Sequence, residues 1–262
     1  LKIFPFFIGL KLFLKDKFKY FDFILIFMII LMIFLSYHRT SIIILFLFIF
    51  MTYIFIYELR KIISIIAALL AFIIFLTQIL FVDFSDSVVS KTKKQIFSSS
   101  GIKLYPDHYL GHFNTSIKMI KKNLLLGTGP NTFKDLCSDK KYEYIYTEFI
   151  GKNSNLVKLN SCSTHTHNYY LQIFSEGGIF SFCLLIFFYF FIFKELVFCY
   201  LKKNSLNDNV LYKTCLISTF CNFFPFSPNV DFFNTYLNTV LYLPCIFILY
   251  FKLNNKGFFK KN

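Results

Sequence analysis

The chain has 262 residues, of which 56% are hydrophobic and 16% charged, and its formal net charge is +14. Apolar runs this long exclude a soluble domain with a single buried core and predict an integral membrane protein. The positive charge is almost entirely lysine, since Arg39 and Arg60 are the only arginines. Basic residues beside apolar spans report topology and contact with anionic headgroups, so we do not take them as evidence for nucleic-acid binding.

Six apolar stretches are long enough to cross the bilayer as helices, which takes about 20 residues. They cover residues 20–37, 41–57, 62–82, 168–193, 210–226 and 232–251, and residues 1–14 look like the end of a further, partial span. The short lysine and arginine clusters between the spans all fall on one side, which is then the cytoplasmic side. The sequence predicts an all-α fold, a polytopic transmembrane helical bundle that forms a single domain over residues 1–262.

One long polar segment, residues 83–166, is predicted to be a large periplasmic loop within this domain. Inside it, residues 107–125 are predicted to form an amphipathic helix that lies on the membrane surface and is ended by Gly127. The apolar stripe of this helix is Phe113, Ile117, Ile120 and Leu124. Residues 140–161 show no clear periodicity and are predicted to be loop.

The stretch "CSTHTHNYYLQIFSEGG", residues 162–178, places polar groups at the outer end of a predicted span. His167 and Gly178 are 11 residues apart, about three helical turns, so they share a face with Asn168 and Gln172 between them. One interpretation is a capped helix N-terminus followed by a glycine pair that lets a neighbouring helix approach. The other is a functional site, because an ionisable Glu176 inside a span is costly.

All five histidines and Arg39 fall on the outer side of the predicted topology. Arg39 begins a span in "LSYHRTSIIILF". An arginine at such a place either snorkels to the membrane interface or binds phosphate or pyrophosphate in a bidentate manner. Any functional site built from these residues is therefore expected on the outer face of the membrane.

A metal site is an alternative for these residues, with ligands drawn from Cys162, His165 and His167 and from His108 and His112. No single stretch has a complete ligand spacing, so no metal is predicted. Since the outer side is oxidising, Cys137 and Cys162 are instead a candidate disulfide. The glycine-rich "GTGPNTF" is by itself only a helix stop and a turn.

Taken in order, these segments resemble the superfamily of O-antigen ligases and O-antigen polymerases, which are bacterial membrane glycosyltransferases. The resemblance rests on Arg39, on "MIKKNLLLGTGPNTFKDLC" with its Gly127 and Gly129, on "HTHNYYLQIFSEGGIFSF" and on the closing hairpin in residues 224–251. It covers most of residues 20–251. Lys134 departs from the family pattern, since many members carry arginine at that place.

The resemblance implies transfer of a glycan from polyprenyl-pyrophosphate to an acceptor on the periplasmic face of the bacterial inner membrane, with no metal and no cofactor. It implies His167 as the base, Glu176 as a catalytic residue that partners one of the histidines, and Arg39 and Lys134 as pyrophosphate ligands. His165 and Asn168 are the other expected substrate-binding residues, and Gly178, Gly127 and Gly129 are expected to be structural. The expected acceptor is lipid A-core, as in a ligase, and the alternative is a second lipid-linked repeat, as in a polymerase.

Two further hypotheses stay open at this stage. Family members usually have about a dozen spans, so we expect this chain to be the C-terminal portion of such a protein, and an inactive fragment is one hypothesis. A transporter or flippase of lipid-linked sugars is the other, and it would carry polar groups at mid-membrane depth in several helices. Here the polar groups cluster at outer helix ends, which favours an enzyme. The expected partners are the lipid-linked donor, the acceptor glycolipid and membrane lipids, and no nucleic acid.

Overall fold

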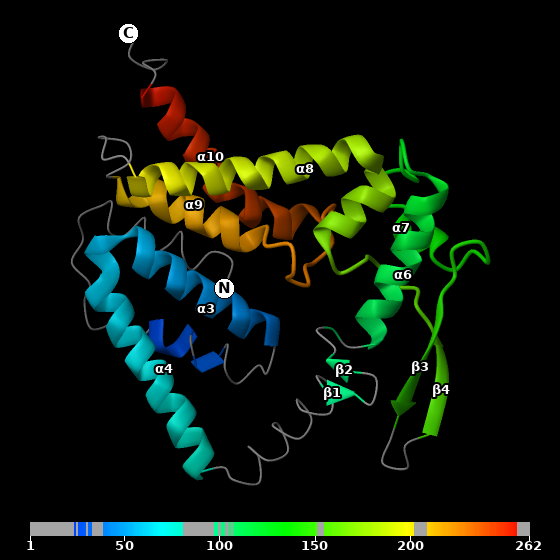
Figure 1. Ribbon diagram of the computed structural model, residues 1–262, viewed down its shortest axis with the longest axis horizontal. Helices are drawn as coiled ribbons and strands as arrows, with labels where there is room; N and C mark the ends of the chain where they lie inside the picture. The colour runs from blue at the N-terminus through cyan, green and yellow to red at the C-terminus, as the bar shows by residue number, and fades with distance from the viewer. Residues whose placement is uncertain are drawn as a thin grey trace. The chain divides into compact units, whose positions relative to one another are not determined.

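Helices make up most of the part of the chain that the computed structural model describes (Figure 1). The described residues are 24, 26–29, 31–32, 39–80, 97–98, 101–102, 105, 107–150, 155–201 and 209–255. The partial span predicted at residues 1–14 and most of the span predicted at 20–37 lie outside them. The helices are α3 (Arg39–Phe55), η1 (Tyr57–Leu59), α4 (Arg60–Leu80), α6 (Asp107–Lys122), α7 (Phe133–Leu136), α8 (Tyr169–Leu201), α9 (Val210–Asn222) and α10 (Thr235–Asn255).

The predicted apolar stretches are helical over most of the residues that the structure describes, with non-helical ends such as 223–226 and 232–234. Among the described residues, one helix, α8, is long and apolar enough to cross a membrane. The apolar parts of α3, α4 and α10 are shorter, at Ile42–Phe55, Ile63–Phe72 and Leu241–Asn254. The helical class is therefore observed, whereas the six spans and the periplasmic position of residues 83–166 stay predictions.

Two short antiparallel hairpins interrupt the helical pattern. Strands β1 (Phe97–Ser98) and β2 (Gly101–Ile102) form one, and β3 (Ile145–Ile150) and β4 (Asn155–Asn160) form the other. The second hairpin corrects the prediction of loop for residues 140–161. Its register pairs Ile145 with Asn160 and Ile150 with Asn155. The β-branched and aromatic residues of β3 favour an extended backbone even where no alternation is visible.

The chain divides into two compact units. The first comprises residues Leu1–Leu76, Phe188–Ser227 and Thr235–Asn262, and the second comprises Thr77–Phe187 and Pro228–Asn234. In the first unit, α9 is the central element, since its residues from Leu211 to Asn222 are all buried and both α3 and α10 pack against it. Glu195 on α8 accepts hydrogen bonds there from Lys252 (2.6 Å) and from the Tyr212 hydroxyl (3.0 Å).

The second unit is built around α6. Its buried face consists of His112, Thr115, Ser116, Met119 and Ile120. Of the predicted apolar stripe, Ile120 is part of this face, whereas Ile117 and Leu124 are exposed, and the position of the helix on the membrane surface stays a prediction. The buried polar groups are satisfied locally: the Ser116 hydroxyl donates to the carbonyl of His112 (2.9 Å), and the Thr115 and Ser161 hydroxyls bond to each other.

Helix α8 is broken at Gly178, whose φ of 71° and ψ of −171° lie outside the helical region. The amide of Ile179 then donates to the carbonyl of Leu124 (2.9 Å) instead of to Ser175, four residues back in its own helix. From Ile179 to Leu201 there remain 23 residues, about 35 Å of helix, which is enough to cross about 30 Å of hydrocarbon. The polar residues before the break are therefore not needed for the span.

The break at Gly178 gives a first prediction. A Cβ at position 178 would collide with the backbone of Leu125, and a non-glycine residue at this φ and ψ is strained by roughly 1–3 kcal/mol before any collision. We expect Gly178→Ala to lower the midpoint of thermal unfolding in detergent, followed by circular dichroism. Cys183→Ala, at an exposed position in the same helix, is the matched control. Equal midpoints for the two variants would show that the break tolerates a side chain.

Candidate functional site

A turn of residues 127–133, the GTGPNTF turn, docks onto the broken end of α8. The amides of Thr128 and Gly129 donate to the carbonyls of Ser175 and Glu176, each at 2.9 Å. These two carbonyls are available because the break at Gly178 removes the amides that would otherwise bond to them. The turn and the end of α8 approach so closely at Gly127 that a Cβ there would collide with the backbone of Glu176. Gly127 and Gly178, two of the predicted structural glycines, thus lie against each other where the backbones of the turn and of α8 are in direct contact.

The Glu176 carboxylate holds the other end of the turn. Its Oε1 accepts from the amide of Phe133 (2.8 Å) and its Oε2 from the amide of Asn131 (3.0 Å). The side chain is 1% exposed. Asn131 has φ 60°, and this conformation points its amide at the carboxylate. Both oxygens of Glu176 are therefore engaged by backbone of the turn.

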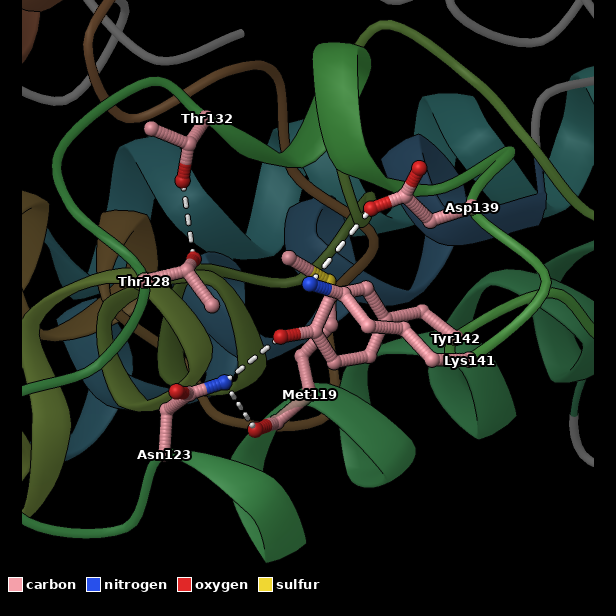
Figure 2. Close-up of polar contacts among 7 residues, drawn as sticks. All are labelled: Met119, Asn123, Thr128, Thr132, Asp139, Lys141 and Tyr142. Carbon is pink, nitrogen blue, oxygen red and sulfur yellow. Dashed lines mark hydrogen bonds and ion pairs between the residues drawn. The ribbon is translucent and has the colours of Figure 1, made fainter.

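Further hydrogen bonds within the second unit hold the GTGPNTF turn and the residues that precede it (Figure 2). Asn123, just after α6, donates to the hydroxyl of Tyr142 (2.8 Å), and its carbonyl accepts from the amide of Gly127 (2.9 Å). Inside the turn, the hydroxyls of Thr128 and Thr132 bond to each other (2.8 Å). The turn is thus held by backbone and side-chain contacts along its whole length.

Gln172 extends the polar face of α8 to a third segment. Its amide nitrogen donates to Asp231 (2.7 Å), and its amide oxygen accepts from the backbone of Phe232 (2.9 Å). The amide of Asn229 donates to the carbonyl of His167 (2.8 Å). One face of α8 therefore joins the GTGPNTF turn and residues 228–234 within the second unit.

Four of the five histidines form a cluster, the histidine cluster: His108 and His112 from α6, and His165 and His167 from the segment before α8. The ring of His167 is 4.0 Å from that of His165, 5.2 Å from that of His112 and 4.9 Å from that of Tyr109, measured between ring centroids. The ring of His108 is 6.5 Å from that of His112. The fifth histidine, His38, lies outside the described residues.

Burial favours the neutral form of three imidazoles of the cluster, those of His112, His165 and His167. Burial, followed by the charges of the neighbouring histidines, lowers the pKa of His167 to about 3. Burial also lowers the pKa of His112 and of His165, and the carboxylate of Asp231 opposes that change at His165. Nδ1 of His112 donates to the carbonyl of Ser161 (2.7 Å), which fixes the tautomer of that ring.

His167 also has an unusual backbone, with φ 58°. Residues other than glycine adopt this left-handed conformation rarely, and such residues cluster at functional sites. Its Nε2 is 3.4 Å from the Ser163 hydroxyl, a long contact that leaves the nitrogen weakly engaged. His167 thus combines a strained backbone with a weakly engaged ring nitrogen.

Asn168 has a structural role. Its side-chain oxygen accepts from the amides of Tyr170 (3.0 Å) and Leu171 (3.1 Å), and so caps the N-terminus of α8. This favours the capping interpretation of the residue over substrate binding. The Thr166 hydroxyl donates to the carbonyl of Asn168 (2.8 Å) and is fully buried.

The remaining expected site residues are placed as follows. Cys137 and Cys162 form a disulfide, which ties the end of α7 to the segment before His165. Cys162 is then no thiolate ligand for zinc, and no group of three or more metal-ligating side chains occurs within the described part of the chain. Lys134 is exposed on α7. Arg39 begins α3 in the first unit, and nothing is described of its side chain, so its role stays a prediction.

Asp231 is a residue of this region that the sequence patterns did not indicate. It is the only acidic residue after Asp208, and it lies in a largely apolar stretch, which was a usable signal. Tyr109 was also missed, although it lies next to His108 on the predicted helix. The i, i+4 spacing of His108 and His112 did indicate that these two rings lie on one face.

A family model described as O-Antigen ligase matches residues 23–186, which is more than half of the chain. The chain belongs to the O-antigen ligase family. The match contains the histidine cluster, the GTGPNTF turn, Glu176 and Gly178, and it ends before Asp231. No curated protein and no solved structure matches the chain. Membership makes it a membrane protein of the O-antigen ligase and polymerase class of glycosyltransferases.

The lowered pKa of His167 gives a second prediction. Between about pH 3 and the usual value of 6.5 the unfolded chain binds the proton and the folded chain does not. The stability from this histidine is therefore complete above pH 6.5 and is lost as the pH falls below it. We expect the thermal unfolding midpoint of the parent to be lower at about pH 5 than at about pH 7.5. The difference between the two pH values should be smaller in His167→Gln.

The control for this comparison is Asp139→Asn, which changes an exposed charge that pairs with Lys141 at 3.6 Å. It should keep the pH dependence of the parent over this interval. The same slope in His167→Gln as in the parent would mean that the imidazole is charged in the folded protein.

Proposed function

We propose that this protein transfers a glycan from a polyprenyl-pyrophosphate donor to an acceptor hydroxyl on the periplasmic face of the bacterial inner membrane, most closely as an O-antigen ligase acting on lipid A-core. The observation that carries the proposal is His167, a neutral imidazole in a strained backbone conformation within a cluster of aromatic rings. Family membership supplies the reaction class.

In the proposed reaction the acceptor oxygen attacks the anomeric carbon of the donor. The bond from that carbon to the phosphate oxygen breaks, and pyrophosphate leaves with the electron pair. Nε2 of His167 accepts the hydroxyl proton as general base, a role that contributes roughly 10²–10⁴-fold to rate. Lys134 is a proposed contact of the pyrophosphate, where a cation stabilises the charge that develops on the leaving group. The resemblance implies the same role for Arg39.

The low pKa of His167 fits this scheme once the charge of the donor is considered. An imidazole with a pKa of about 3 is a weak base in the empty site. A diphosphate bound nearby favours the imidazolium and raises that pKa toward neutrality. The base thus becomes effective only when the donor is bound.

Glu176 has a positioning role in this proposal. Its two oxygens are occupied by the amides of Asn131 and Phe133, so it orients the turn that precedes Lys134 and does not itself move a proton. His165 contacts the ring of His167 at 4.0 Å and orients it, with Asp231 as the nearby negative charge.

The third prediction tests the base. The parent and His167→Ala are reconstituted in liposomes with a lipid-linked donor, and lipid A-core and a second lipid-linked glycan are offered as separate acceptors. We expect His167→Ala to transfer roughly 100-fold more slowly or worse. Asp139→Asn is the control and should transfer as the parent does. Parent-like transfer by His167→Ala would remove the histidine from the reaction, and transfer only to the lipid-linked glycan would make the protein a polymerase.

A chelator arm accompanies this experiment. Transfer by the parent should survive chelation of divalent cations, because the proposed contacts of the leaving group are side-chain cations. Loss of transfer on chelation, restored by added Mg²⁺, would contradict that assignment.

The fourth prediction separates the positioning role of Glu176 from a catalytic one. In Glu176→Gln the new NH₂ group faces one of the two backbone amides, which leaves a buried donor unpaired at a cost of about 1–3 kcal/mol. We expect kcat/KM for the donor to fall about tenfold, which is about 1.4 kcal/mol, with an unchanged pH profile. Glu143→Gln, at an acid outside the turn, is the control. A displaced pH profile in Glu176→Gln would instead make Glu176 part of the acid–base chemistry.

A further inference from the structure

Three exposed leucines, Leu124, Leu125 and Leu126, stand between α6 and the GTGPNTF turn. Their side chains are 49%, 63% and 81% exposed. Contiguous exposed leucines of this kind mark an interaction surface and not ordinary surface variation. The family assignment and the proposed chemistry use none of the three.

The backbone of these leucines is rigid. On one side Asn123 is held by its bond to the Tyr142 hydroxyl (2.8 Å), as Figure 2 shows. On the other side Gly127 is bonded to Asn123 (2.9 Å) and is in contact with the backbone of Glu176. The leucines are therefore displayed by a fixed loop, and their exposure does not come from a loose chain.

The same loop is attached at the start of the apolar part of α8. The amide of Ile179 donates to the carbonyl of Leu124 (2.9 Å), and Gly178 is packed against the carbonyl of Leu125. Phe180, the next residue of α8, is 67% exposed, and Leu184 and Phe187 continue this exposed apolar stripe along the helix. The leucines thus lie at the level where the lipid-facing surface of α8 begins.

Basic residues adjoin the leucines on the other side. Lys121 and Lys122, in the last turn of α6, are both exposed. Apolar side chains that reach the acyl region, with lysines one turn away at the headgroups, are the arrangement of interfacial membrane anchors. Anionic lipid attracts each such lysine electrostatically.

We propose that Leu124–Leu126 is a membrane-inserting loop, which enters the outer leaflet beside Phe180 while Lys121 and Lys122 contact anionic phospholipid headgroups. The occupant of this surface is the bilayer. The insertion itself does not depend on glycosyl transfer. If the proposed function also holds, the loop fixes the GTGPNTF turn at the depth where a lipid-linked donor presents its pyrophosphate.

The test uses the absence of tryptophan from the chain. Leu126→Trp gives a full chain with a single tryptophan, which is reconstituted in bilayers that contain phosphatidylglycerol, with and without lipids brominated on the acyl chains. We expect blue-shifted emission, strong quenching by the brominated lipids and little quenching by aqueous acrylamide.

Two reference variants calibrate the result. Leu184→Trp lies on the exposed stripe of α8 and marks the lipid environment. Ile145→Trp lies at an exposed position at the start of β3 and marks water. Emission and quenching of Leu126→Trp like those of Leu184→Trp support insertion, and values like those of Ile145→Trp overturn it.

A second arm tests the lysines. Quenching of Leu126→Trp should be stronger in bilayers with phosphatidylglycerol than in pure phosphatidylcholine, and added Lys121→Gln and Lys122→Gln should remove the difference. Equal quenching in both lipids before the lysines are changed would refute the headgroup contact. Fluorescence reports insertion whether or not the protein transfers a glycan, so a failure of the proposed function would not be mistaken for a failure of the loop.

Discussion

The contact of Gly127 with the broken end of α8 is the constraint on which the second unit depends. A continuous helix would bond the amide of Ile179 to the carbonyl of Ser175 and leave no acceptor for the GTGPNTF turn. At the break the amide of Ile179 donates to Leu124 instead, and the carbonyls of Ser175 and Glu176 accept from amides of the turn. Only glycines allow the two backbones to come this close. The turn and the helix end thus form one structure, and the Glu176 carboxylate completes it by accepting from two amides of the turn.

The break also explains how this membrane protein keeps an acid near the end of a predicted span. An ionised side chain in hydrocarbon is costly. Here the helix beyond Gly178 is long enough to cross the bilayer by itself, and the carboxylate of Glu176 is paired with two amides of the turn. The polar face of Asn168, Gln172 and Glu176 therefore serves three different partners at the membrane boundary: its own helix end, residues 228–234 and the turn.

The sequence predicted the helices well where apolar residues run without interruption. Its prediction that His167 and Gly178 share a helical face was wrong, because α8 begins at Tyr169 and His167 precedes it with φ 58°. The sequence patterns did not predict contacts between segments that are far apart along the chain. The glycine pair was predicted to admit a helix, but the partner is a turn some 50 residues earlier, and no local pattern encodes a positive φ at Gly178. The buried face of α6 was not predicted, because it is satisfied by hydroxyls and a histidine, which a hydrophobic pattern does not register.

The Cys137–Cys162 disulfide has a consequence for how this protein matures. Thiols stay reduced in the cytosol and are oxidised beyond the inner membrane. In the proposed orientation the bond closes only after residues 137–162 have been translocated, and it then ties α7 to the segment that carries the histidines. Assembly of the site is thereby coupled to export, so a chain still on the cytoplasmic side holds its histidines without this tether.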